Sequence, residues 1–474
     1  MRRLVGRIIL TCALVAGVAV GPGSTTASAT TAAPATTAAP ATTAASAPIA
    51  ASATTAPKTC GTPSASDPFG TATPAQENLD AARLVSAVTT LSTRLRLSVQ
   101  VFRNNCLVAT HPLEAVGGAV HNNLWSATKS VVSMLTGIAV GQGELRLDDP
   151  IGRHLPTGPG WGDAAHRAIT VRQLLTQTSG LRQSIVSEAA TTGTDPHLAQ
   201  EALSQPFVHK PGTTFQYSQL GPALLAYVVQ RAVHQDLVDF AQERLFGPIG
   251  IERGSYFWLR DRSGNAYGYA HLFLTPPQLA RLALLMSNHG RWNGSQVVPS
   301  SYVAAVSRPH ATNGCYGLLF WTNRGKPCTG ADIPTAQTLR RHAIPSAPAD
   351  AYEMNGTGGQ LAIMIPSLNM TVVTTGYFGS LALDPPVLLG SAPDEMQWTF
   401  FRALMSAVED AHVHDPGPYP GDPIDLDVNP RNYLDPAVLL SDAVTNPHCN
   451  LVFCDGTIPT KGLAQNLRAL PGLL

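Results

Sequence analysis

The segment from Ser126 to Gly143 constrains the fold most, because it has the length of a helix and almost no polar face. Apolar residues lie on nearly every side of the predicted helix: Val131, Val132, Met134, Leu135, Ile138 and Ala139. A helix of this kind is stable when other elements surround it. Gly141 and Gly143 are expected to end it. The sequence therefore predicts a helix that is buried on nearly all sides.

Two polar residues at the start of this helix form the candidate catalytic pair. Lys129 follows Ser126 by three residues, so the two side chains share a face. The chain has five lysines, and Lys129 alone has a serine at this spacing. Burial lowers the pKa of a lysine, and a neutral lysine can take the serine proton. The free N–H groups of the first turn favour negative charge nearby. The alternative interpretation is a helix-capping serine followed by a lysine whose ammonium reaches solvent.

The N-terminus has the pattern of a secretory signal peptide over residues 1–29. Arginines at the start precede an apolar stretch, Ile8–Val20, and Ala27, Ser28 and Ala29 supply a cleavage site. An uncleaved anchor is the alternative. Later segments do not reach the roughly 18 uninterrupted apolar residues of a spanning helix, so we expect no transmembrane segment after signal cleavage. The predicted location is secreted or in the cell envelope.

Composition divides the remainder into three parts. Residues 30–73 are predicted to be a disordered linker rich in Ala, Thr and Pro, because they lack the large apolar residues that a core needs. Residues 74–413 form the predicted catalytic domain, and residues 414–474 a Pro- and Asp-rich extension of unknown role. The 31 basic and 31 acidic residues balance. This neutrality excludes nucleic acid as a partner and favours a small-molecule substrate.

Cysteine usage agrees with export. Cys12 lies inside the predicted signal peptide, and the other six allow about 15 pairings. Proximity in the sequence favours the pairs Cys315–Cys328 and Cys449–Cys454, and Cys60–Cys106 is the pair that remains. The Cys449–Cys454 bond would close a small loop in the extension. Six reduced, buried cysteines are the alternative. CxxC spacing and HExxH are both absent from the sequence, so we expect no metal and no cofactor.

Strand patterns occur near both ends of the predicted domain. Leu97–Val101 and Cys106–Thr110 are expected to form a hairpin, and Gln360–Ile365 with Met370–Thr375 a second one. A helix is expected on either side of them, at 75–94 and 398–413. A helix-rich stretch lies between the two hairpins. The predicted fold class is therefore α/β in the α+β sense, with an antiparallel sheet from both termini flanked by helices and an inserted helical subdomain.

The segment around the candidate pair resembles the serine β-lactamase and penicillin-binding-protein superfamily. Leu124–Ser130 resembles its nucleophile motif, and Ile169–Leu181 and Pro211–Gly221 resemble two further signatures. The resemblance implies a β-lactamase/transpeptidase-like fold and places Tyr217 at the position of a proton-transferring tyrosine. A phenol near Lys129 is expected to lose its proton below its usual pKa. Gln219 stands where the family has Asn, which puts the positioning of the substrate amide in doubt.

The domain as a whole resembles the branch of class C β-lactamases, D-Ala-D-Ala carboxypeptidases and esterases. Its third motif is similar to the variant found in 6-aminohexanoate-dimer hydrolases and related amide and ester hydrolases. Asn355–Leu361 reads Asn-Gly-Thr-Gly-Gly-Gln-Leu and leads into a strand. Thr357 is the candidate for the second oxyanion donor beside Ser126, with Gly359 as the alternative register and Gly358 between them. The usual Lys or His is missing here, so strong recognition of a substrate carboxylate is not expected.

Together these motifs predict a serine hydrolase that forms an acyl-enzyme on Ser126. The expected substrate is a small ester, amide or peptide, with cell-wall peptide as one possible source. Esterase or small-amide hydrolase activity ranks before D-Ala-D-Ala carboxypeptidase and then β-lactamase. The alternative is a catalytically weak or inactive binding protein of the cell envelope on the same scaffold.

Overall fold

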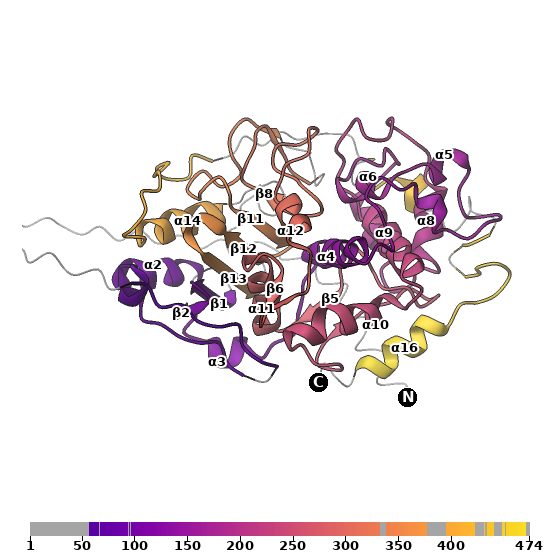
Figure 1. Cartoon of the computed structure of the whole chain (residues 1–474). Helices are drawn as coiled ribbons and strands as arrows, with labels where there is room; N and C mark the ends of the chain where they lie inside the picture. The colour runs from indigo at the N-terminus through magenta and orange to yellow at the C-terminus, as the bar shows by residue number, and fades with distance from the viewer. Residues whose placement is uncertain are drawn as a thin grey trace, which may run out of the picture. The chain divides into compact units, whose positions relative to one another are not determined.

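A six-stranded antiparallel sheet organises the structure, which is a computed structural model. It describes residues 56–470 except 66, 93, 95, 332–337, 377–394, 422–430, 432–433, 440–447 and 451, so the predicted signal peptide and the linker up to residue 55 lie outside the described residues. Within this part, the strand order is β2-β1-β13-β12-β11-β8. Strands from both ends of the domain meet where β1 pairs with β13, which confirms the predicted architecture (Figure 1).

The strands of the main sheet are β1 (Arg96–Arg103), β2 (Cys106–Thr110), β8 (Trp321–Thr322), β11 (Tyr352–Gly356), β12 (Gln360–Ile365) and β13 (Met370–Gly376). Shorter strands are β3 (Asn122–Asn123), β4 (Phe257–Trp258), β5 (Leu272–Leu274), β6 (Arg291–Trp292), β7 (Ser295–Gln296), β9 (Cys328–Thr329) and β10 (Thr338–Leu339). The helices are α2 (Ala81–Ser92), α3 (Glu114–Gly117), α4 (Ala127–Gly141), α5 (Ala164–Arg167), α6 (Val171–Leu175), α7 (Ile185–Ala190), α8 (Leu198–Ser204), α9 (Leu220–Ala232), α10 (Leu237–Ala241), α11 (Pro276–Ser287), α12 (Ser300–Val306), α14 (Glu395–Ser406), α15 (Pro436–Leu439) and α16 (Lys461–Ala469).

Alternate residues of the central strands enter two separate apolar cores. Leu361 and Ile363 pack on one face with α2 and α14, whereas Ala362 and Met364 pack on the other face with α4, α9 and α11. This division follows from the two-residue period of a strand. Helices α5 to α10 lie on the α4 side of the sheet and form the inserted helical part (Figure 1).

Helix α4 has the buried position that its sequence predicts. Every residue from Ala127 to Ala139 is buried, and the helix ends at Gly141. Gly137 packs against the Tyr302 ring so closely that a Cβ there would lie 2.4 Å from a ring carbon. Burial of one large apolar side chain contributes about 1.5–3 kcal/mol. The site-bearing helix is therefore held in place along its whole length.

Two predicted helices have different limits. The helix expected over 75–94 is split, because Thr73 caps a short 3-10 turn, Pro74–Glu77, that ends at Asn78 with a left-handed φ of 51°. The chain then restarts as α2. The helix expected over 398–413 begins earlier, at Glu395, and ends at Ser406, where Val408 turns to bridge with Leu79.

The three expected disulfides, Cys60–Cys106, Cys315–Cys328 and Cys449–Cys454, are all present. The Cys60–Cys106 bond shows that the predicted linker, residues 30–73, ends too late in the sequence. The described residues between 56 and 73 belong to this predicted linker, yet they pack on the domain. Cys60 is buried, and Thr71 bridges with Leu107. The disulfide and the backbone pairing fix this arm, so the ordered part begins before residue 74.

The extension after residue 413 begins against α14, where Arg402 bonds to Asp415, and its described residues from 434 onward contact the helical part. Asp435 is buried against α7, Cys454 faces Gln200 of α8, and α16 contacts the segment after β4 through Asn466 and Arg260. Among the described residues, no helix has the length and apolar character needed to cross a membrane.

Candidate active site

The segment before Ser126 is fixed by a short sheet and one amide side chain. Strand β3 pairs with β5, and the Leu124 N–H donates to the Leu272 carbonyl at 2.8 Å. The Asn123 Oδ1 accepts the backbone N–H groups of Trp125 and His271, both at 3.0 Å. Trp125 has a φ of 47°, a strained value for a residue with a side chain. The hydrogen bonds of Asn123 and Leu124 hold this backbone conformation directly before Ser126.

Ser126 immediately precedes α4, but its hydroxyl does not cap the helix. Its Oγ lies 3.0 Å from the Nζ of Lys129. The Lys129 side chain is 1% exposed, so its amine does not reach solvent. These two observations contradict the alternative of a capping serine with a solvent-seeking lysine.

The Lys129 amine is surrounded by three oxygen atoms. Besides Ser126, its Nζ contacts the Gln219 Oε1 at 2.5 Å and the Tyr269 carbonyl at 3.1 Å. Both oxygens can only accept, so each takes one N–H hydrogen of the amine, and the third position of the nitrogen faces the Ser126 Oγ. When the amine is neutral, its lone pair can occupy that third position. Burial lowers the pKa of Lys129 well below its usual value, while the charge of Glu188 opposes that shift.

Tyr217 lies beside the pair, with its ring centroid 4.6 Å from the Lys129 Nζ. It is 4% exposed and stacks on Trp321. Burial raises the pKa of Tyr217, and its hydrogen bond with Ser126 opposes this only in part. The expected fall in this pKa is therefore wrong: the amine faces the ring rather than the phenol oxygen, and desolvation dominates. Tyr217 is a neutral phenol that can donate a proton.

Gln219 reaches Lys129 although it is longer than the expected Asn. It is the residue before α9, and its backbone N–H donates to the Glu188 Oε2 at 2.5 Å. Its side-chain oxygen is thereby turned toward the Lys129 Nζ. The substitution thus preserves an amide acceptor for the lysine.

The third motif forms the turn between β11 and β12. A Cβ added at Gly356 would lie 2.0 Å from the Leu124 carbonyl oxygen, so only glycine allows this turn to approach the Ser126 segment. Buried Arg96 donates to the carbonyls of Gly358 and Gly359, and both glycines have positive φ. These two residues shape the turn, and their carbonyls bond to Arg96 behind it.

Two backbone N–H groups are available near the site. Neither the Ser126 N–H nor the Thr357 N–H donates to another residue in the described part of the chain. Ser126 is half-buried and Thr357 is exposed, so both can face a bound molecule. The approach of Gly356 to Leu124 brings the two segments together. The two N–H groups remain the candidate oxyanion donors.

Sequence reasoning missed several residues of the site. Glu188 and His271 are buried near Lys129, and the Tyr269 carbonyl contacts its amine. Burial lowers the pKa of His271 to about 4, with Lys129 adding to the shift, so this ring is neutral. Their contacts run through backbone groups or across distant segments, so residue spacing gave no signal. Among the described residues, no cluster of His, Cys, Asp and Glu is arranged to hold a metal ion.

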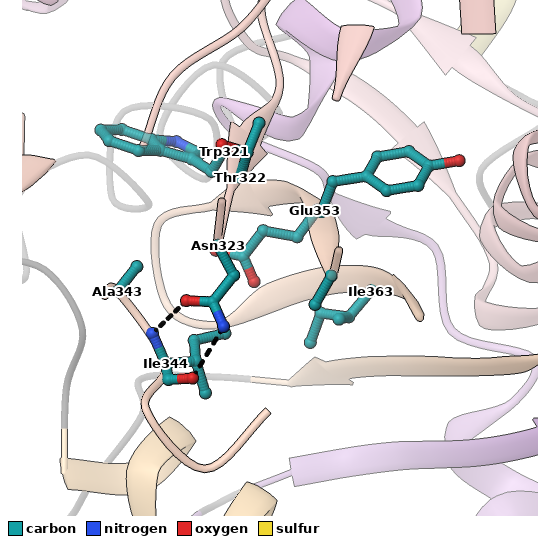
Figure 2. A pocket seen from close by; sticks show the side chains of 9 residues that line it. Trp321, Thr322, Asn323, Ala343, Ile344, Glu353 and Ile363 are labelled. Carbon is teal, nitrogen blue, oxygen red and sulfur yellow. Dashed lines mark hydrogen bonds between the residues drawn. The ribbon is translucent and has the colours of Figure 1, made fainter. Parts of the chain in front are cut away.

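A small hollow near the site is separate from it. Figure 2 shows Asn323 bound through its amide to both backbone groups of Ile344, at 2.8 Å each. Trp321 and Glu353 also line this space, which holds about 10 Å³. That volume admits about one water molecule at most. The hollow therefore has a structural role behind the Trp321 ring, on which Tyr217 stacks.

The fold and the serine–lysine site define a class of β-lactamase/transpeptidase-like hydrolases. The family model described as Beta-lactamase matches residues 101–375, more than half of the chain. The chain belongs to the beta-lactamase family, and the matched range includes Ser126, Lys129, Tyr217 and Thr357.

Individual relatives match more narrowly. Protein flp of Staphylococcus aureus is 29% identical over 30% of this chain and 30% of its own length. Esterase EstB of Burkholderia gladioli is 32% identical over 27% of this chain and 36% of its own. The chain thus spans about a third of the length of these curated relatives. A structure from Bacillus anthracis described as a 6-aminohexanoate-dimer hydrolase shares the fold, with 14% identity, a TM-score of 0.52, and coverage of 73% of this chain and 88% of that chain.

The glycine contact gives a direct test of this geometry. We expect Gly356→Ala to lower the rate at which a fluorophosphonate labels Ser126 by about 100-fold, because the turn must move away from Leu124. The free energy of unfolding should fall by about 1–3 kcal/mol. Gly61→Ala is the control, since a Cβ there meets nothing within 4 Å. Wild-type labelling in the Gly356 variant would contradict the account.

Proposed function

We propose that this protein is an exported serine hydrolase that cleaves small esters or amides through an acyl-Ser126 intermediate. The observation that carries the proposal is the buried Lys129 amine, which two acceptor-only oxygens hold against the Ser126 hydroxyl. Membership of the beta-lactamase family supports hydrolysis of a small substrate. The similarity to an esterase supports esters as substrates.

Acylation follows from the positions of four groups. Neutral Lys129 takes the Ser126 hydroxyl proton while Oγ forms a bond to the substrate carbonyl carbon. The resulting oxyanion accepts hydrogen bonds from the Ser126 and Thr357 N–H groups. Tyr217 donates its proton to the leaving oxygen or nitrogen, and the Lys129 ammonium gives its extra proton to the resulting phenolate, so that both groups end the step neutral. The bond to the leaving group breaks, and the acyl group stays on Ser126.

Deacylation reverses the proton movements. A water molecule attacks the acyl carbon and gives its proton to the neutral amine of Lys129. The Ser126 oxygen leaves with a proton, and the free acid is released. Both half-reactions need Lys129 to be neutral at the start, which its burial favours.

The charges around the third motif favour substrates without a carboxylate. Asn355–Leu361 contains no Lys, Arg or His that could bind a substrate carboxylate. Arg96 is 2% exposed and its guanidinium bonds to the turn carbonyls, so it is shielded from substrate. Trp125 is 41% exposed beside Ser126 and offers an apolar contact. We therefore place simple esters and small amides before D-Ala-D-Ala peptides and β-lactams.

A substrate panel with a nucleophile variant tests the activity. We expect wild-type protein to hydrolyse p-nitrophenyl acetate and butyrate faster than a D-Ala-D-Ala peptide or nitrocefin. Ser126→Ala should lose at least about 1,000-fold in rate and all fluorophosphonate labelling, because the acyl acceptor is gone.

Ser204→Ala is the control, because the Ser204 hydroxyl bonds to the Glu201 carbonyl on α8 and it should keep wild-type turnover. Labelling of the Ser126 variant at wild-type intensity would overturn the assignment. Wild-type protein that turns over none of these substrates and stays unlabelled would favour an inactive binding protein.

Export is the second part of the proposal. It is supported by the signal pattern of residues 1–29 and by three disulfides, which persist in oxidising compartments. Protein collected from the medium or envelope fraction should begin after Ala29 when its N-terminus is sequenced. Protein that stays inside the cell with residues 1–29 intact would contradict export.

A further inference from the structure

A buried carboxylate beside the site takes no part in the steps above. Glu188 lies on α7 and is 0% exposed. Its Oε2 accepts the N–H groups of Gln219 at 2.5 Å and Leu220 at 3.3 Å, and its Oε1 accepts that of Ser184 at 3.2 Å. Fixing a buried carboxylate in this way costs free energy that a neutral side chain would avoid.

The hydrogen bonds of Glu188 connect it to Lys129 through one intervening residue. It holds the backbone of Gln219, whose side chain holds the Lys129 amine. The Glu188 backbone carbonyl also faces the Tyr269 hydroxyl at 3.4 Å, and the Tyr269 carbonyl is another partner of the amine. Glu188 therefore supports both acceptor-only contacts of Lys129 without touching a substrate.

Charge gives Glu188 a second effect on the lysine. When Lys129 takes the Ser126 proton, an ammonium forms in a buried site, which is unfavourable without a nearby negative charge. In the described part of the chain, Glu188 is the acidic group that acts on Lys129 and opposes the fall in its pKa. Burial raises the pKa of Glu188 to about 7, with backbone N–H groups and Lys129 opposing the rise.

We propose that Glu188 is a positioning residue that orients Gln219 against Lys129 and stabilises the ammonium formed when Ser126 attacks. This inference rests on the proposed function.

The helix that carries Glu188, α7, is held in place by the C-terminal extension. The Asp435 N–H donates to the Ser187 hydroxyl at 2.9 Å, and the Ser187 hydroxyl faces the Asp435 carbonyl.

Other charged and titratable groups lie around Glu188, and their protonation also affects a pH experiment. Lys129 comes from α4, and Tyr269 and His271 come from the segment before β5. Asp435 and Arg182, 3.8 Å apart, lie beyond Ser187 on the outer side of α7. Burial places the pKa of His271 near 4 and that of Tyr269 well above its usual range, so both stay neutral near neutral pH.

The pH dependence of Glu188→Gln tests the proposal. Removing the negative charge lowers the pKa of Lys129 further, so the acidic limb of the kcat/KM profile for p-nitrophenyl butyrate should move to lower pH by about one unit. The plateau kcat should fall about 10- to 100-fold, because the ammonium in the transition state loses its counter-charge. KM should change little, since Glu188 does not contact the substrate.

Glu77→Gln is the matched control, since Glu77 is also 0% exposed and bonds to Asn104 away from the site. It should lose stability but keep the wild-type pH profile. Glu188→Asp keeps the charge, so its acidic limb should stay at the wild-type pH while the rate falls through the weakened bond to Gln219. This variant carries the test if Glu188→Gln does not fold.

A folded Glu188→Gln whose acidic limb stays at the wild-type pH would overturn the inference, as would wild-type kcat in that variant. An aspartate variant whose limb moves by a full unit would also overturn it. Failure of the proposed function has a different signature, because wild-type protein would then show neither turnover nor labelling at Ser126.

Discussion

The rest of the site depends on the burial of the Lys129 amine. A lysine in water is an ammonium and has no lone pair for a serine proton. Here the surrounding core removes water from the amine, and the oxygens of Gln219 and Tyr269 occupy its two N–H hydrogens. The remaining position of the nitrogen faces the Ser126 Oγ at 3.0 Å, where a neutral amine can take the hydroxyl proton. The roles of the other site residues follow from how they contact Ser126 or Lys129.

The sheet explains how distant segments reach that contact. Strand β1 pairs with β13, so the strands that carry the third motif join strands from the start of the domain. Gln360 fastens the end of β12 to Gly376 through its side-chain amide, and Arg96 holds the turn before it. The turn is thereby pressed against the segment of Ser126, where Gly356 leaves room for the Leu124 carbonyl.

The sequence predicted what is encoded in local patterns. The apolar run after Ser126 predicted a buried helix, and cysteine proximity predicted the disulfide pairs. The prediction from sequence failed where a property depends on the orientation of a side chain. The pKa of Tyr217 is an example, because the ring of this residue, rather than its oxygen, faces the Lys129 amine. Glu188 escaped notice because its partners are backbone N–H groups that any residue could supply. Packing of residues 56–73 was missed because the composition of this arm is polar, and Cys60 anchors it.

The protonation state of Lys129 is the most direct test of the account. The chain has five lysines, so protein labelled with carbon-13 at lysine Cε gives a simple spectrum, and the Lys129 signal is the one that a Lys129→Arg variant lacks. We expect the Lys129 signal to stay at the position of a neutral amine well below the usual lysine pKa of 10.5, because burial lowers the pKa of this amine. A Lys129 signal that titrates near its usual pKa of 10.5 would contradict the account.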